Sequence, residues 1–162
     1  MIKPKEKLGI NALDIIIKKE ENGKKITMIG FFPRTQEIRL VAKELWILEQ
    51  DPYLLNPSHG IILGTSAEYV IPKTNILVIT GSSLINKSIE RLLKISRSKN
   101  AHTIILGPST PLCDVLFSYG VNMIAGAEVT DPDAILKKIS QSRGMLSTKM
   151  CKNEIQFRVM ER

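Results

Sequence analysis

The sequence predicts an α/β protein in which helices cover both faces of a mostly parallel sheet of about five to six strands, a Rossmann-like, doubly wound, three-layer fold. Two observations predict it. Short apolar runs alternate along the chain with helical patterns of roughly 10–15 residues, which is typical of βαβ units. The runs are also apolar almost throughout, as expected for strands that are covered on both faces.

The first quarter of the chain begins with a predicted helix. Residues 10–19 place apolar side chains at helical spacing, and Asn22-Gly23 is a typical helix end. The apolar run at 26–29 predicts the first strand. An apolar helical face at 38–45 and a second strand at 45–48 follow, and their shared residue leaves that boundary open.

The middle of the chain contains a loop before the next strand. Residues 53–64 are expected to be loop, and Thr65–Glu68 has the pattern of a capping box for a short helix that ends before Pro72. The apolar run at 75–79 predicts the third strand. Apolar residues at helical spacing over 85–95 predict the helix that follows it.

The last third of the chain continues the alternation. The run at 102–106 predicts a fourth strand, and Thr110-Pro111 reads as an N-cap followed by proline at the first position of a helix over 110–119. A fifth strand is predicted at 122–125 and a helix at 131–139. Alternating apolar residues at 155–159 predict a sixth, edge-like strand.

The composition favours one soluble domain. The chain has 162 residues, 43% of them hydrophobic and 24% charged, which excludes a disordered or collagen-like chain. Its net charge of +7 is concentrated near the two ends and aromatic residues make up 5%, so we expect no nucleic-acid partner. Two cysteines without a CxxC motif exclude a disulfide framework, and no signal peptide or membrane span is evident. We therefore expect a cytoplasmic protein without a membrane partner.

Small, polar or acidic residues follow the predicted strands, and this pattern indicates a ligand site. In such sheets ligands bind outside the carboxyl ends of the strands, where small residues allow close approach to the backbone. Turn geometry alone also favours glycine and serine, so the pattern does not name the ligand. The residues concerned are Gly30, Glu49, Thr80, Gly81, Ser82, Gly107, Pro108, Ser109 and Gly126.

Gly30 and Glu49 have the spacing of a dinucleotide site, in which an acid on the second strand binds a ribose about 20 residues after the glycine turn. However, Phe31, Phe32 and Pro33 stand where the second glycine of that motif is needed. A standard dinucleotide site is therefore not expected. A nucleoside-like or other small ligand remains open, with Glu49 on its hydroxyls and a phenylalanine against its flat face.

Candidate metal ligands are few. Glu49 and Asp51 are oxygen donors two residues apart and could serve a hard cation, although paired loop acids are commonly just solvated. His59 and His102 are far apart in the sequence. Cys113 lies near the start of a predicted helix, where a thiolate is favoured, or is a small buried residue. No known catalytic motif can be made out.

Five motifs occur in an order and spacing that resemble the Rossmann-like domain of the putative heavy-metal chelation family. The resemblance covers roughly residues 10–160. The motifs are Met28–Pro33 (MIGFFP), Leu48–Gln50 (LEQ), Thr80–Asn86 (TGSSLIN), Ser88–Leu93 (SIERLL) and Leu106–Leu112 (LGPSTPL).

The resemblance implies a site and a domain organisation. Family members carry an upstream enolase-N-terminal-like domain, with the active site between the two domains. We expect this domain to be absent here, residues 1–25 to form a lead-in and helix, and residues 26–162 to form one Rossmann-like domain. The positions that match family motifs and would line the site are Gly30, Phe31, Phe32, Pro33, Glu49, Thr80, Gly81, Ser82, Asn86, Gly107, Pro108, Ser109 and Thr110.

Three functions remain open on these grounds. The first is binding of a small anionic ligand, a divalent or heavy metal, or a metal-containing cofactor, with Thr80, Ser82 and Ser109 as donors and Glu49 accepting from a hydroxyl or binding a cation. The second is an enzyme, a transferase or oxidoreductase with a nucleotide-like cofactor in the same cleft. The third is a non-catalytic assembly subunit.

A missing covering domain would leave Phe31 and Phe32 exposed at the rim of the site. Exposed apolar patches tend to mark interaction surfaces, so we expect a homodimer or a separate partner subunit. The alternative is a monomer in which both rings fold under the helix near residues 35–45. The edge-like strand at 155–159 offers a second route to association through strand pairing.

Overall fold

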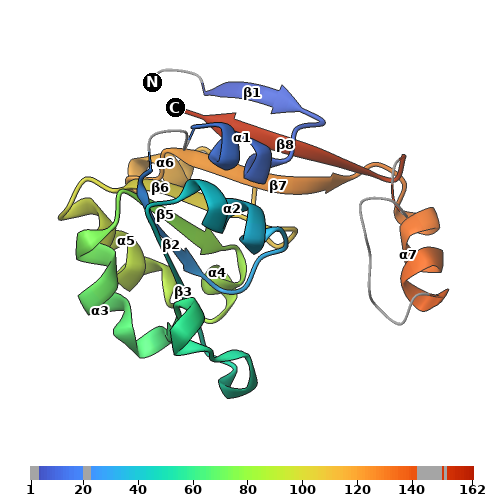
Figure 1. The fold of residues 1–162 in the computed structure, drawn as a ribbon. Helices are drawn as coiled ribbons and strands as arrows, with labels where there is room; N and C mark the ends of the chain where they lie inside the picture. Colours follow the sequence, from blue (N-terminus) through green and yellow to red (C-terminus); the bar gives the residue numbers. More distant parts are fainter. Residues whose placement is uncertain (1–3, 20–22, 142–150, 152) are drawn as a thin grey trace.

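One eight-stranded sheet organises the residues that the structure describes. The structure is a computed structural model, and it describes residues 4–19, 23–141, 151 and 153–162. The sheet order is β1-β8-β7-β6-β5-β2-β3-β4 (Figure 1). The strands are β1 (Lys5–Leu8), β2 (Lys25–Ile29), β3 (Glu44–Glu49), β4 (Ile61–Leu63), β5 (Ile76–Thr80), β6 (His102–Leu106), β7 (Met123–Val129) and β8 (Ile155–Glu161).

The sheet is mostly parallel, which confirms the predicted class. Strands β2 to β7 pair in parallel with one another, whereas β8 pairs antiparallel with both β7 and β1. The predicted number of strands was too low, because β1 and β4 had not been expected. The prediction that residues 155–159 form an edge was also wrong, because β1 covers the outer side of β8.

The parallel strands have the order of a dinucleotide-binding sheet. Counted from β2 along the chain, the order β4-β3-β2-β5-β6-β7 becomes 3-2-1-4-5-6. The strand order therefore reverses between β2 and β5, which pair in parallel through Ile29 and Ile79 near their carboxyl ends. In such sheets this switch point is the place where ligands bind.

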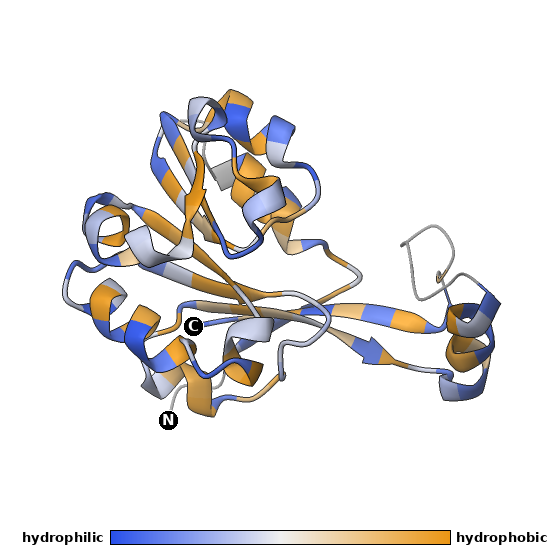
Figure 2. Ribbon diagram, turned by 90° about the horizontal axis from the view of Figure 1, so that it is seen from below, coloured by the Kyte–Doolittle hydropathy of each residue, from blue (hydrophilic) through white to orange (hydrophobic). Residues whose placement is uncertain are grey.

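Helices cover both faces of the sheet, so the molecule has three layers. One core packs α1 (Ala12–Lys19) and α2 (Thr35–Val41) on the sheet, and the other packs α3 (Ala67–Val70), α5 (Ile89–Arg97) and α6 (Val115–Ser118) on the opposite face. Figure 2 shows hydrophobic residues along the strands between these layers. Helix α7 (Pro132–Gln141) lies apart from them, at the far end of β7 and β8 (Figure 1).

The helix predicted at 85–95 is interrupted. The short helix α4 (Ser82–Ile85) is followed by a turn in which the Asn86 side chain accepts from the Ser88 backbone and hydroxyl, at 3.1 and 2.7 Å. Lys87 has a φ of 61° and separates α4 from α5. Ile85 is consequently 73% exposed and does not belong to the buried face, contrary to the prediction.

The helix predicted at Thr110-Pro111 begins later, at Val115. Thr110 closes a turn by donating its backbone N–H to Gly107 O at 3.0 Å, and Cys113 closes another by donating to Pro111 O at 3.0 Å. These turns occupy the residues that the N-cap prediction had assigned to the first helical turn. None of the helices in the described ranges is long and apolar enough to cross a membrane.

Candidate functional site

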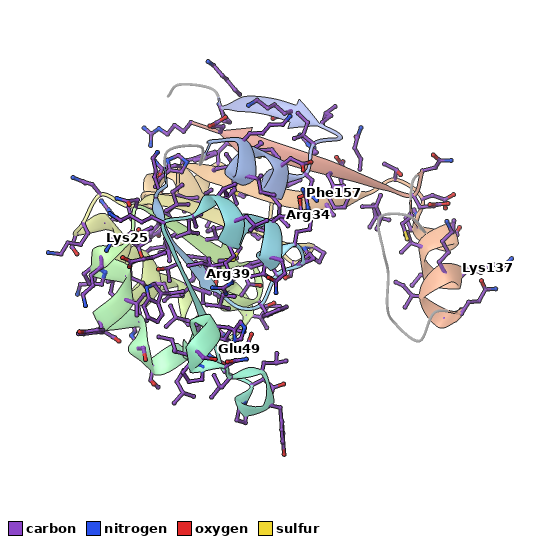
Figure 3. All side chains as sticks on the ribbon, in the orientation of Figure 1. Lys25, Arg34, Arg39, Glu49, Lys137 and Phe157 are labelled. Atoms are coloured by element: carbon purple, nitrogen blue, oxygen red, sulfur yellow. The ribbon has the colours of Figure 1, made fainter. Side chains whose placement is uncertain are left out.

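A cavity of about 290 Å³ opens at the carboxyl ends of β2, β3 and β5, beside the switch point of the sheet. We call it the strand-end cavity. Glu49, which projects from the end of β3, is labelled in Figure 3. Five of the residues predicted from the sequence line it together: Gly30, Glu49, Thr80, Ser82 and Asn86.

The ends of β2 and β5 meet tightly at this cavity. Gly30 has a φ of +92°, and a Cβ atom there would lie 3.2 Å from the methyl group of Thr80. Both the backbone angle and the available space therefore favour glycine at this position. Its backbone N–H donates to Leu48 O at 2.9 Å, which ties the turn after β2 to the end of β3.

The Glu49 carboxylate is oriented by its own turn. Its Oε1 atom accepts hydrogen bonds from the backbone N–H groups of Gln50 at 2.7 Å and Asp51 at 3.2 Å. Among the described residues its Oε2 atom makes no hydrogen bond or ion pair. One oxygen thus stabilises the turn after β3, while the other remains available to a ligand, because a carboxylate has about four acceptor positions.

Hydroxyl and amide groups form the wall supplied by β5 and α4. The Thr80 hydroxyl and the Ser82 hydroxyl lie 3.4 Å apart, and Ser83 donates its hydroxyl to Thr80 O at 2.7 Å. The Asn86 side-chain oxygen is occupied by Ser88, so its amide NH₂ group is the part left to donate. The wall therefore offers neutral groups, several of which can donate hydrogen bonds.

Several lining residues were not among those predicted. Ser88 and Arg91 belong to a motif, Ser88–Leu93, that had been recognised as a motif but not as a wall of the site. Its polar residues were the signal that could have identified them. The other unpredicted lining residues are Ile29, Leu48, Gln50, Gly64, Ala67, Ser83 and Leu92.

Arg91 brings the positive charge of this cavity and is paired with Glu68 of α3. Both side chains are more than half exposed. The Arg91 guanidinium lowers the pKa of the Glu68 carboxyl below its usual range, chiefly through their hydrogen bond. The pair links α3 to α5 across the rim without burying either charge.

Replacing Arg91 by glutamine should raise the pKa of Glu68 toward its ordinary value, because the hydrogen bond and the opposite charge are both lost. Since the folded-state pKa of Glu68 is lowered, the pair's contribution to stability is complete above about pH 4.3, the unfolded value. That contribution declines as the pH falls through the folded-state pKa. A carboxyl-detected NMR titration measures the change, and Lys94→Gln on the same helix is the control that should leave the Glu68 titration where it is.

Phe31, Phe32 and Pro33 do not line the strand-end cavity but a separate one of about 480 Å³ beside α2 and β4. Phe31 is 51% exposed, whereas Phe32 is buried in the core, and its carbonyl accepts the Thr35 hydroxyl at 2.6 Å. The expectation that both rings are exposed is therefore wrong for Phe32. Of the two rings, Phe31 is the one left exposed at the surface.

The second loop of the predicted site, which follows β6, packs against Gly81 in the turn after β5. Gly81 donates its backbone N–H to Leu106 O at 3.1 Å, and an added Cβ atom there would lie 2.6 Å from the backbone nitrogen of Thr110. Thr110 is 4% exposed, and its hydroxyl has no hydrogen-bond partner in the described part of the chain. Gly81, Gly107, Pro108, Ser109 and Thr110 are thus not lining residues of the strand-end cavity.

The candidate metal ligands remain scattered. Asp51 accepts from Tyr53 N–H at 2.9 Å and caps the turn 52–54 rather than lining the cavity. His59 contacts Asn56 and Ser58 in an exposed turn. Cys113 is exposed and precedes α6, contrary to the prediction of a helical position. Within the described ranges, no group of three or more His, Cys, Asp or Glu side chains gathers to hold a metal ion.

Two solved structures share this fold. A protein of unknown function from Desulfitobacterium hafniense matches with a TM-score of 0.79 and 24% identity over 94% of this chain. A protein of unknown function from Pyrococcus horikoshii matches with a TM-score of 0.77 and 22% identity over 98% of this chain. The chain spans 57% and 60% of the lengths of these two structures. No curated protein matches the sequence.

Both structures come from the DUF364 family. The model of that family, described as "Putative heavy-metal chelation", matches residues 11–160 of this chain. The match includes strands β2 to β7, the residues of the strand-end cavity and the five sequence motifs, whereas β1 lies outside it. The chain therefore belongs to the putative heavy-metal chelation family, DUF364.

Proposed function

We propose that this chain binds a small anionic ligand or a metal-containing cofactor in the strand-end cavity. The observation that carries the proposal is the convergence of five motif residues on one cavity beside the switch point: three at the ends of β2, β3 and β5, and two on or next to α4. Turn geometry explains glycine or serine at each strand end separately. It does not require Gly30, Glu49 and Thr80 to line the same space.

The wall from β5 to α5 suits the anionic part of a ligand. Thr80 and Ser82 supply hydroxyl groups, Asn86 has an amide NH₂ left to donate, and Arg91 supplies a positive charge. Hydrogen bonds between such donors and an anion are stronger than those between neutral groups. Glu49 lines the other side of the cavity, at the end of β3. There its Oε2 atom accepts from a hydroxyl or contacts a cation.

A metal in this cavity would arrive with most of its own ligands. Glu49 is the acidic side chain among the lining residues, and the other polar ones carry hydroxyls, amides or a guanidinium. Soft metals prefer thiolate and imidazole donors, whereas this set suits the periphery of a complex that is already coordinated. The description of the family supports a metal complex as one class of ligand.

The test compares two serines that the sequence had placed in one site. Ser82 lines the cavity and Ser109 does not, although both are exposed. We expect Ser82→Ala to weaken binding about tenfold, the effect of one hydrogen bond to a charged group, and Ser109→Ala to leave it unchanged. Co²⁺, inorganic phosphate, NAD and S-adenosylmethionine are screened first by thermal shift, since a ligand that binds only the native state raises the melting temperature.

Isothermal titration then measures the affinity of any ligand found. An equal or larger loss in Ser109→Ala would place the ligand at the loop after β6 and contradict the proposal. An unchanged affinity in Ser82→Ala would show that the wall formed by α4 does not bind the ligand, and it would also contradict the proposal.

A further inference from the structure

We infer that the ligand of the strand-end cavity contains a ribose with free 2′ and 3′ hydroxyls, and that Glu49 binds this diol. The inference rests on the proposed function and names the chemical class of its ligand: a nucleoside or a nucleoside-containing cofactor without a pyrophosphate at the first strand turn. It is carried by the position of Glu49 in the sheet, the state of its two oxygens, and the shape of the turn after β2.

The order of the strands places Glu49 where a ribose binds in sheets of this kind. In a sheet of order 3-2-1-4-5-6, the acidic residue at the end of the second strand reaches the ribose of a nucleotide bound at the switch point. Strand β3 is second in this order, pairs in parallel with the first strand, β2, and ends at Glu49. Glu49 lines the same cavity as Gly30 and Thr80, which mark the two sides of the switch point.

The carboxylate of Glu49 is held in one orientation and has one oxygen free to accept from a diol. Because Oε1 accepts two backbone N–H groups, the side chain is held in one orientation before any ligand arrives. Oε2 has no hydrogen bond or ion pair in the described part of the chain, and it retains two acceptor positions. Two neighbouring hydroxyls supply two donors, so a vicinal diol satisfies this oxygen whereas a single hydroxyl would leave one position to water.

The remainder of the cavity suits a flat base beside the ribose. Leu48, Ala67 and Leu92 are buried side chains that supply an apolar floor. Gln50 and the free amide group of Asn86 offer polar contacts at the edge. The volume of about 290 Å³ is at the lower limit of ordinary ligand pockets, which suits one nucleoside better than a dinucleotide.

The turn after β2 excludes the pyrophosphate that dinucleotides carry. Phe32 fills the core beneath this turn, and the Thr35 hydroxyl at the start of α2 is already donated to the Phe32 carbonyl. Phe31 and Pro33 line the separate cavity beside β4. In dinucleotide-binding proteins, glycines in this turn let a pyrophosphate approach the backbone. Two phenylalanines and a proline stand in their place here. The cavity therefore has a position for the ribose and none for the pyrophosphate.

The test titrates the full chain with adenosine, 2′-deoxyadenosine and 3′-deoxyadenosine, using amide chemical shifts of Gly30, Gly64 and Thr80 to locate binding. We expect adenosine to bind at the cavity, and removal of either hydroxyl to weaken binding about tenfold, because each hydrogen bond to a carboxylate is lost. Glu49→Gln keeps an oxygen for the turn amides but loses the charge, so it should weaken adenosine about tenfold while the melting temperature stays near the wild-type value.

Glu90→Gln is the matched control, because it removes the same charge from an exposed position on α5 that does not line the cavity. Its affinity for adenosine should equal that of the wild type. Equal binding of the three nucleosides, or full binding by Glu49→Gln, would overturn the diol inference. If adenosine leaves the amide signals of the cavity unchanged while phosphate or Co²⁺ shifts them, the diol inference is wrong and the proposed function stands. If no probe, S-adenosylmethionine included, shifts them, both fall.

Discussion

Replacing Gly81 by alanine should lower the free energy of unfolding by about 3 kcal/mol, at the upper end of what an added methyl group costs in a packed interior. The new Cβ atom would lie 2.6 Å from the Thr110 backbone nitrogen, 2.6 Å from its hydroxyl oxygen and 2.8 Å from the Ser109 carbonyl carbon. Two of these three atoms belong to the backbone, so no change of rotamer relieves the contact. Urea denaturation measures the loss.

Gly64→Ala is the matched control for this prediction. A Cβ atom at Gly64 would meet Gln50 Cγ at 3.5 Å and Glu49 O at 3.7 Å, which are ordinary contacts. Alanine also reduces the conformational freedom of the unfolded chain, so this variant should be as stable as the wild type or more stable by up to about 1 kcal/mol. A Gly81→Ala protein as stable as Gly64→Ala would show that the loop after β6 does not press on the turn after β5.

Leu77→Ala is expected to lower the free energy of unfolding by about 4 kcal/mol. Leu77 is 0% exposed on β5, the strand that joins the two halves of the sheet, and it packs in the core beneath α3, α5 and α6. Removing three side-chain carbons there forfeits their burial and leaves a cavity, because the flanking strands β2 and β6 hold the backbone in place.

Leu40→Ala makes the same chemical change where nothing is buried. Leu40 lies on α2 and is 87% exposed, so its loss should change stability by less than about 0.5 kcal/mol. Chemical denaturation of both variants under one set of conditions gives the comparison. Equal losses in the two proteins would contradict the placement of β5 at the centre of the sheet.

The strands that the sequence predicted correctly are those whose own residues determine them. Ile76–Thr80 and His102–Leu106 are apolar runs that can only be buried between two layers, and both are found there. Strand β1 was missed for the opposite reason, whereas β4 is an apolar run of three residues inside a stretch that was expected to be loop. The sequence KEKL at β1 is charged, and it is a strand because it pairs with β8, more than 140 residues away in the chain.

The residues of the candidate site also fall into those that were predicted correctly and those that only the structure could place. Gly30, Glu49 and Thr80 were predicted together because the carboxyl ends of parallel strands lie on one edge of a sheet. The loop Gly107–Thr110 was predicted with them on equal grounds, but it follows the next strand, β6, and packs against Gly81, which does not line the cavity. Neighbouring strand ends need not face the same cavity, and only the packing of the loops decides which of them do.

Periodicity and the order of strands and helices were sufficient to determine the α/β class, the layers and the strand ends that carry polar residues, because each depends on residues close together in the chain. The tertiary structure decided the rest. It placed β8 inside the sheet, turned Phe32 into the core and made Arg91 a lining residue of the same cavity as Glu49. These outcomes depend on contacts between segments far apart in the sequence, which no local pattern records.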